Sequence, residues 1–425
     1  MRLTSILAVA ALAPLTIAAA PAAAATVSPA GVRFPQLAVN AGGATLIAWE
    51  RLTKGSYAIE ARSGSSAGRL GPIQRLTSQG GFTRAAIGAD GTGAIEWVEF
   101  GAHGVRSLRV AVARPGHRFG RPQLLDRRRA NVLPAGVAVQ PTGRVVAIWQ
   151  RTGSRLGFAL APRDKAFGAA RDLASTSAIA AGTIPVDARD GSVVVAYGTQ
   201  PTISPPVNRQ AAVRTLSPSA ATFSAPAILS GGAGSSPLSE ALPTMVSGAG
   251  GTGVAYTQTG PYGLALVRRA ADGSWQPPER IAVGGYGEDV YPAGLRATIG
   301  ADGSAVAAWG LDHEVPSGLG GSLSNQTVAA VAGPGAPFGP EQPLTPPAAH
   351  FGVPAVAAAG GEAFVATAEP HGPVLLATRS ADATTFATAR ELTTHGSGDV
   401  VLAAAGRHVV AGYQVDDRLR LDVVR

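Results

Sequence analysis

Short apolar runs that end in an aromatic residue recur along the whole chain, and a glycine stands six positions before most of these residues. Runs such as "ATLIAWE" (44–50) and "SVVVAY" (192–197) are almost continuously apolar. Such runs indicate short β-strands that are buried on both faces. The aromatic residue that ends each apolar run is called its anchor here, and the anchors lie 46 to 59 positions apart. A threonine takes the place of the aromatic residue in one unit. The anchors are Trp49, Trp97, Trp149, Tyr197, Tyr256, Trp309, Thr367 and Tyr413.

A second marker follows the first in a constant phase. It is a pair of apolar residues six positions apart near the end of each of the first seven units. Two markers in one phase identify an internal repeat of about fifty residues. The pairs are Leu70/Leu76, Phe119/Leu125, Phe167/Leu173, Phe223/Leu229, Trp275/Ile281, Phe338/Leu344 and Phe386/Leu392.

Each unit predicts four strands, which in the first unit cover 35–40, 44–50, 57–63 and 71–77. The first two strands are joined by a glycine-containing turn such as "NAGG" or "GADG", and glycine accepts the positive φ of a tight turn. One four-stranded sheet cannot bury both of its faces alone, whereas a ring of sheets can. The sequence therefore predicts an all-β protein, a β-propeller of four-stranded blades.

Eight sets of strands can be counted, but the eighth ends after its third strand at the last residue, Arg425. The segment "TVSPAGVR" (26–33) precedes the first unit and is expected to supply the missing fourth strand, so that the two ends of the chain close the ring. Seven blades and an extra hairpin are the alternative.

The first 25 residues have the pattern of a secretion signal: Arg2, an apolar run, and the small residues of "AAAPAAAA" (18–25). We therefore expect a signal peptide over 1–25, a single propeller domain over 26–425, an extracytoplasmic location and no transmembrane segment after signal removal. The chain contains no cysteine, which excludes disulfides and thiolate metal sites.

The formal net charge is +8, and the one dense basic cluster is "DRRRAN" (126–131). A basic exported protein is attracted to anionic envelope polymers. A scatter of unrelated surface arginines gives the same net charge, so both interpretations stay open.

Long connections gather at one end of the predicted propeller, on the rim formed by the loops between second and third strands and by the links between blades. Loops on a rigid scaffold commonly carry function. The rim is therefore the expected binding surface. Its long segments are 198–208, 230–241, 284–291 and 310–325.

Two turns, "AADGSW" (270–275) and "SADATTF" (380–386), resemble the Asp box of the bacterial-neuraminidase-repeat propellers, with fewer residues between the aspartate and the aromatic residue. The resemblance covers nearly the whole chain as architecture. It implies that Asp272 and Asp382 form turns.

Sialidases of that family carry an aromatic-Arg-Ile-Pro motif in the first blade, and "RFP" at Arg33, Phe34 and Pro35 is similar to it. The resemblance implies that Arg33 binds a substrate carboxylate. However, an apolar residue followed by proline recurs at this position in other units, so only Arg33 departs from the repeat, and an ordinary surface arginine also fits.

Other polar residues of the rim are weaker candidates for substrate binding. One group is a Tyr/carboxylate cluster and the other combines two carboxylates with a histidine, and a solvated loop accounts for either. No catalytic residue, metal site or cofactor is predicted. The candidates are Tyr286, Glu288, Asp289, Asp312, His313 and Glu314.

Two functions remain. The favoured one is an exported, monomeric binding or scaffold propeller whose partner is a glycan, an envelope polymer or a protein, with no nucleic-acid motif. The alternative is a sialidase-like glycoside hydrolase.

Overall fold

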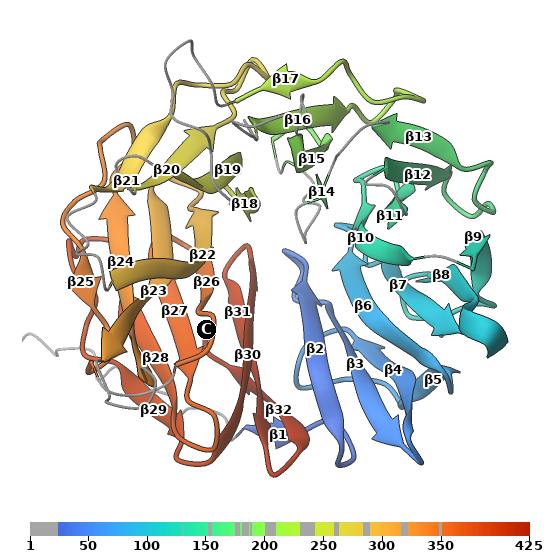
Figure 1. The fold of residues 1–425 in the computed structure, drawn as a ribbon, viewed down its shortest axis with the longest axis horizontal. Coiled ribbons are helices and arrows are strands. Elements are labelled where there is room, and N and C mark those ends of the chain that lie inside the picture. The colour runs from blue at the N-terminus through green and yellow to red at the C-terminus, as the bar shows by residue number, and fades with distance from the viewer. Residues whose placement is uncertain are drawn as a thin grey trace, which may run out of the picture.

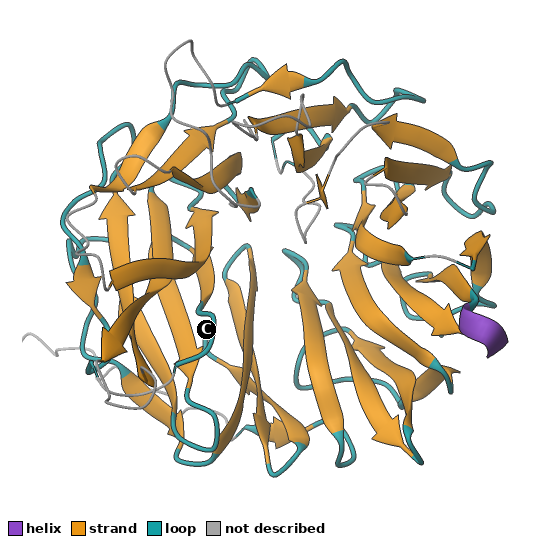
Figure 2. Ribbon diagram, in the orientation of Figure 1, coloured by secondary structure: helices purple, strands orange, loops and turns teal. Residues whose placement is uncertain are grey.

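The computed structural model contains eight four-stranded antiparallel sheets arranged around a common axis (Figure 1). Almost all of the regular structure is strand (Figure 2). The predicted eight-bladed propeller is therefore confirmed. The structure describes residues 24–129, 131–151, 155–174, 179–180, 187, 189–199, 210–229, 243–258, 263–283, 290–315, 322–347 and 351–425.

The strands of blades 1 to 4 follow the chain from the centre outward. Blade 1 contains β2 (Val32–Val39), β3 (Thr45–Thr53), β4 (Ser56–Gly64) and β5 (Gln74–Thr77). Blade 2 contains β6 (Gly80–Ile87), β7 (Gly93–Phe100), a 3-10 turn (Ala102–Gly104), β8 (Arg106–Ala113) and β9 (Gln123–Arg128). Blade 3 contains β10 (Val132–Val139), β11 (Val145–Arg151), β12 (Arg155–Ala161) and β13 (Arg171–Ala174). Blade 4 contains β14 (Ile179–Ala180), β15 (Val193–Thr199), β16 (Gln210–Leu216) and β17 (Ala227–Ile228).

The remaining blades repeat this order until the last one. Blade 5 contains β18 (Thr244–Gly248), β19 (Gly251–Gln258), β20 (Gly263–Arg268) and β21 (Glu279–Val283). Blade 6 contains β22 (Val290–Ile299), β23 (Ala305–Val315), β24 (Ser322–Ala332) and β25 (Gln342–Pro343). Blade 7 contains β26 (Ala355–Ala359), β27 (Glu362–Ala368), β28 (Val374–Arg379) and β29 (Arg390–Thr393). Blade 8 contains β30 (Gly396–Ala405), β31 (His408–Val415), β32 (Arg418–Val423) and, from the other end of the chain, β1 (Ala25–Thr26). The strands nearest the centre are β2, β6, β10, β14, β18, β22, β26 and β30.

The N-terminal segment closes the ring, as predicted. Thr26 pairs with Arg420, and the N–H of the buried Val27 donates to the carbonyl of Leu419 at 2.9 Å. The closing strand is shorter than the expected 26–33, because Gly31 turns the chain at a φ of +84°. Residues 32 and 33 therefore begin β2 instead.

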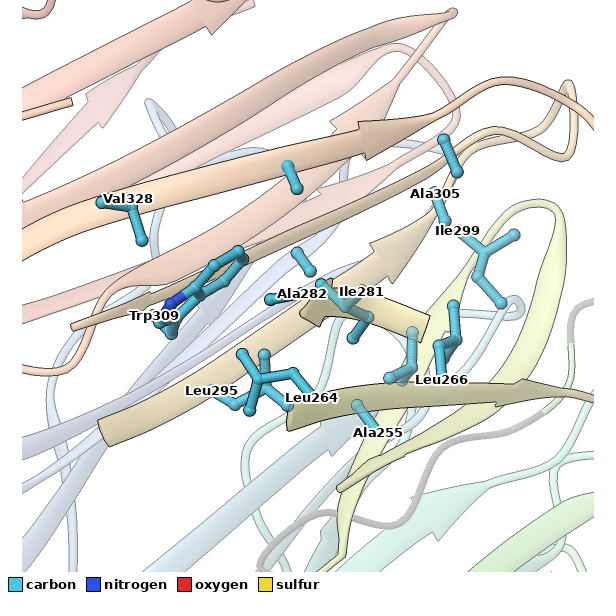
Figure 3. Close-up of a cluster of buried hydrophobic side chains, with 14 of the residues drawn as sticks. Ala255, Leu264, Leu266, Ile281, Ala282, Leu295, Ile299, Ala305, Trp309 and Val328 are labelled. Atoms are coloured by element: carbon cyan, nitrogen blue, oxygen red, sulfur yellow. The ribbon is translucent and has the colours of Figure 1, made fainter. Parts of the chain in front are cut away.

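The aromatic anchor of each described blade packs against the blade that precedes it. Trp97 joins the buried residues of blade 1, and Trp309 belongs to one buried cluster with Leu264 and Ile281 of blade 5 (Figure 3). Thr367 replaces the aromatic residue in blade 7, and its hydroxyl lies 3.1 Å from that of Thr327 in blade 6. Inter-blade packing thus explains the first sequence marker.

The second marker also lies at the boundary between blades. Phe119 forms a bridge back to the end of β8, and its N–H and C=O are both bound by the side chain of Gln74 in blade 1, at 2.8 Å each. Gln342 makes the same pair of bonds to Phe386, at 2.8 and 2.7 Å. Each such glutamine connects the outer strand of one blade to the next blade.

The turns between first and second strands, and between third and fourth, lie together on the rim opposite the long loops. Asp272 acts as the predicted turn-former, because it accepts from both the N–H and the hydroxyl of Ser274, at 2.8 and 2.7 Å. In blade 7 the equivalent turn around the exposed Asp382 is closed by the N–H of Ala383, which donates to the carbonyl of Ser380.

Removing residues 24–28 should destabilise the ring. The change uncovers the edge of β32 and the apolar surface under Val27, which is worth about 1.5–3 kcal/mol when a valine is fully buried. Chemical denaturation should show a lower free energy of unfolding, and light scattering should show concentration-dependent association, because an open strand edge pairs with other chains. Thr26→Ala, which keeps the backbone, is the control. A truncated protein that is monomeric and equally stable would contradict closure by this strand.

Candidate functional site

The candidate site contains two β-bulges, one in each of the inner strands β2 and β6. Both bulges lie near the rim that carries the long loops. The register of β2 against β3 shifts between Arg33 and Gln36, and that of β6 against β7 shifts between Gly81 and Arg84. Bulges of this kind redirect side chains and are frequent beside functional sites.

Each of these two bulges contains a phenylalanine in the left-handed region. Phe34 has a φ of +49° and Phe82 a φ of +59°. The corresponding bulges of β22 and β30 contain glycines at positive φ, Gly294 and Gly398. A bulky residue held in this region costs on the order of 1–3 kcal/mol, and such strain is concentrated at binding and catalytic sites.

Both strained rings are presented to solvent. The exposed fraction is 56% for Phe34 and 47% for Phe82. Phe82 meets Phe100 edge to face, with ring centroids 6.2 Å apart, and the guanidinium of Arg106 lies 5.7 Å from the centroid of Phe100. These residues and Arg33 lie at the ends of neighbouring blades that carry the long loops. The rim cluster is the name used here for Arg33, Phe34, Phe82, Phe100 and Arg106.

A buried carboxylate supports the bulge that carries Phe82. Glu50, at the end of β3, is only 4% exposed, and its Oε1 accepts from the N–H of Thr83 at 3.3 Å. A β-carbon on Gly81 would lie 3.1 Å from the ring of Phe100 and 3.4 Å from Glu50 Oε2. Gly81 therefore permits the ring and the carboxylate to approach one another, and Glu50 positions Phe82.

Arg84 and Glu96 lie opposite each other in the register of β6 and β7, in the interior behind the bulge. Glu96 has no exposed surface, and neither carboxylate oxygen makes a hydrogen bond of normal geometry. Burial raises the pKa of Glu96 well above its ordinary value, although Arg84 and the N–H of Gly136 oppose the change. Burial also raises the pKa of Glu50. The N–H groups of Thr83 and Phe82 and the charge of Arg84 lower that pKa, but by less than burial raises it. Glu96 is sealed from solvent and cannot touch a ligand on the rim.

The structure places Arg33 within the rim cluster. It lies in β2 opposite Glu50, so it is a strand residue and not part of a loop. Its side chain is 46% exposed, and its Nη2 atom is 3.9 Å from an oxygen of Asp417. That distance is too long for a hydrogen bond and leaves the guanidinium available to a ligand.

Of the other candidate residues, the structure describes the backbone of three, which lie in blade 6. Asp312, His313 and Glu314 were expected in a loop, but β23 continues to Val315 and pairs with β24 over the whole distance, so the loop prediction was wrong. The long hairpin supplies backbone partners that a loop would lack. Tyr286, Glu288 and Asp289 lie outside the described residues, as do residues 1–23 of the signal peptide expected over 1–25 and most of the long rim loops.

Sequence reasoning missed Glu50, Phe82, Glu96, Phe100 and Arg106. A signal was present, because a glutamate inside an apolar strand, as in "AIEWVEF", requires a specific partner when it is buried. Within the part of the chain that the structure describes, no three metal-ligating carboxylate or histidine side chains come together. The same part contains no helix long and apolar enough to cross a membrane.

No family model and no curated protein matches the chain. Among solved structures it is similar to a PL25 ulvan lyase bound to -[GlcA(1-4)Rha3S]-, at 11% identity and a TM-score of 0.49, covering 94% of this chain and 95% of that one. It is also similar to a Hadza microbial sialidase, at 8% identity and a TM-score of 0.41 (93% and 66% covered). A quinohemoprotein alcohol dehydrogenase from Comamonas testosteroni gives 7% identity and a TM-score of 0.49 (93% and 76% covered). The expected resemblance to sialidases is thus met only as a structural similarity at low identity.

The buried carboxyl of Glu96 should make stability depend on pH. Because its folded-state pKa is raised above 4.5, the folded protein holds this proton more tightly than the unfolded chain. The stabilisation is complete below pH 4.5 and is lost as the pH rises through the folded pKa. The free energy of unfolding, measured with urea at several pH values, should therefore fall less steeply above pH 4.5 in Glu96→Gln than in the wild type. The exposed Glu391→Gln is the control. Equal slopes in wild type and Glu96→Gln would show that Glu96 is not buried as described.

Proposed function

We propose that the protein is an exported, monomeric binding propeller whose rim cluster holds an acidic glycan. The observation that carries this proposal is the pair of strained, half-exposed phenylalanines in neighbouring blades. Folding alone favours a glycine at these positions, as in β22 and β30. An aromatic ring at such a position lowers the stability of the folded protein, so the ring is better explained by a role in binding than by a role in folding.

The chemistry of the cluster suits a ring-shaped, negatively charged ligand. A half-exposed phenylalanine offers a flat apolar face to the C–H face of a sugar, and aromatic residues and arginine are the residue types enriched in binding surfaces. Arg33 directly precedes Phe34 in β2, and Arg106 lies over the ring of Phe100, which Phe82 meets edge to face. Guanidinium groups bind carboxylates and sulfates with paired hydrogen bonds. The net charge of +8 adds long-range attraction for an anionic polymer.

The cluster favours binding over catalysis. A general acid or nucleophile has to reach the substrate, but the carboxyl groups of Glu50 and Glu96 are buried and Glu50 is engaged with the backbone of the bulge. The residues that face solvent in the cluster are rings and guanidinium groups, which hold a ligand without transferring a proton at neutral pH. The exposed carboxylate of Asp417 lies beside them, 3.9 Å from Arg33, and is the one acid here that a ligand could reach among the residues named.

Phe34→Gly separates the role of the ring from its role in the fold. Glycine adopts a positive φ without strain, so we expect the free energy of unfolding to be unchanged or higher. The ring contact is lost, so we expect binding of acidic polysaccharides to weaken about tenfold, which corresponds to about 1.4 kcal/mol. Isothermal titration calorimetry with uronate-containing and neutral polysaccharides measures the change, after a glycan array has selected the ligand.

Leu124→Ala, at a half-exposed apolar residue on the outer strand β9, is the matched control and should bind normally. Binding that survives Phe34→Gly unchanged would overturn the assignment of the rim cluster. A wild type that binds no glycan but captures a defined protein partner through the same phenylalanine would replace the glycan by a protein.

The sialidase-like alternative is favoured by one observation, which is that Arg33, next to Phe34 and Pro35, is half exposed and only loosely paired. We expect no turnover of a sialoside reporter by the wild type. Arg33→Ala should change the free energy of unfolding by less than about 0.5 kcal/mol, as for most surface substitutions. Reporter hydrolysis by the wild type that disappears in Arg33→Ala would instead identify a hydrolase.

A further inference from the structure

A second polar site lies on the opposite rim, where the short turns of blades 4, 5 and 6 meet. It is a hollow of about 240 Å³, and three arginines line it: Arg189, Arg268 and Arg269. We propose that this hollow binds a tetrahedral oxyanion, either sulfate or phosphate, free or as an ester group of a polymer. The site is independent of the rim cluster.

The wall of the hollow carries more positive than negative charge. Glu279 is the carboxylate among its lining residues, against three guanidinium groups. Two further carboxylates, Asp187 and Asp190, bind Arg269 at 3.0 and 2.9 Å, but they are not among the residues that line the hollow. Counting these two aspartates, three carboxylates face three guanidinium groups, so the whole group is formally neutral. The charged groups that line the cavity itself are still the three guanidinium groups and Glu279.

One donor of these arginines has no hydrogen-bond partner among the residues that the structure describes. Arg269 is 9% exposed, and its Nε atom is buried without a hydrogen bond, although its Nη1 atom binds both aspartates. A buried unsatisfied donor costs about 1–3 kcal/mol, and more when it is charged. Because this atom has almost no exposed surface, it does not itself face the hollow, and an oxyanion there would bind the parts of the three arginines that line it.

The arginines are held in place before any ligand arrives. Arg268 uses Nε and Nη2 on Glu279 and donates from Nη1 to the carbonyl of Gly303 at 2.6 Å. Arg189 uses Nε and Nη2 on Asp187. Such preorganisation lowers the entropy that binding would otherwise cost.

Asp187 is the fixed point of this arrangement. It is fully buried and binds both Arg189 and Arg269. Burial would raise its pKa, but the hydrogen bonds from Arg189 and Arg269 outweigh burial and lower the pKa to about 2. Asp187 therefore stays ionised at ordinary pH, and the guanidinium groups keep their positions.

Calorimetric titration of the full chain with sodium sulfate and sodium phosphate, against chloride at equal ionic strength, tests the proposal. We expect saturable binding of at least one of the two anions and none of chloride. Arg189→Gln should weaken binding about tenfold or more, the effect of losing one charged hydrogen bond. Glu279→Gln removes the negative charge from the wall while the amide oxygen can still accept from Arg268, so it should tighten binding several-fold.

Arg114→Gln is the control, because Arg114 lies on the same rim and pairs with Asp164 at 2.7 Å, away from the hollow. If Arg189→Gln lowers the melting temperature, the gain expected in Glu279→Gln still decides the question. No saturable binding of sulfate or phosphate, or binding that both variants leave unchanged, would overturn the proposal.

Dextran sulfate and neutral dextran distinguish the two sources of the anion. Tighter binding of the sulfated polymer than of free sulfate, lost in Arg189→Gln but kept in Phe34→Gly, assigns the hollow to an ester group. Binding of the free anions with no gain from the polymer assigns it to inorganic sulfate or phosphate. If Phe34→Gly weakens the binding of dextran sulfate and Arg189→Gln does not, the polymer binds at the rim cluster, which would count against an ester site in the hollow.

Discussion

The structure depends on the burial of both faces of every blade. A single four-stranded sheet would leave one apolar face in water, and only neighbours on both sides remove both faces from solvent. This requirement makes ring closure indispensable, and closure rests on a very short element, β1, together with Val27 and Ser28 against β32. The aromatic anchors also help to bury the faces of the blades, because each anchor packs between its own sheet and the sheet of the preceding blade.

Directional bonds then fix how neighbouring blades sit against one another. Apolar packing is not directional, so it permits small sliding motions between sheets. The side chains of Gln74 and Gln342 prevent this motion by binding both the N–H and the C=O of a phenylalanine in the next blade. Thr327 and Thr367 serve a similar purpose where an aromatic anchor is missing. A rigid ring of this kind can hold strained residues that an isolated blade could not.

The two rims use this rigidity for different chemistry. On one rim, Glu50 of blade 1 holds the bulge of blade 2 and so presents Phe82 beside Phe100. On the other, Asp187 of blade 4 holds Arg269 of blade 5. In both places a buried carboxylate of one blade positions a side chain of the next. The ligand-facing groups are therefore set by contacts between blades.

The sequence alone determined the repeat, its anchors and its turns, because each of these follows from local periodicity and from residues that repeat in a constant phase. It favoured eight blades closed by the N-terminal segment, and the pairing of β1 with β32 decided between eight blades and seven. It also singled out Arg33. The tertiary structure decided the rest, since Glu50 and Phe82, or Asp187 and Arg269, belong to different repeats and come together only when the blades stack. The extended hairpin at Asp312 and the left-handed backbone of Phe34 were likewise invisible to periodicity. Both are set by register between strands, and register is fixed by the packing of the whole ring.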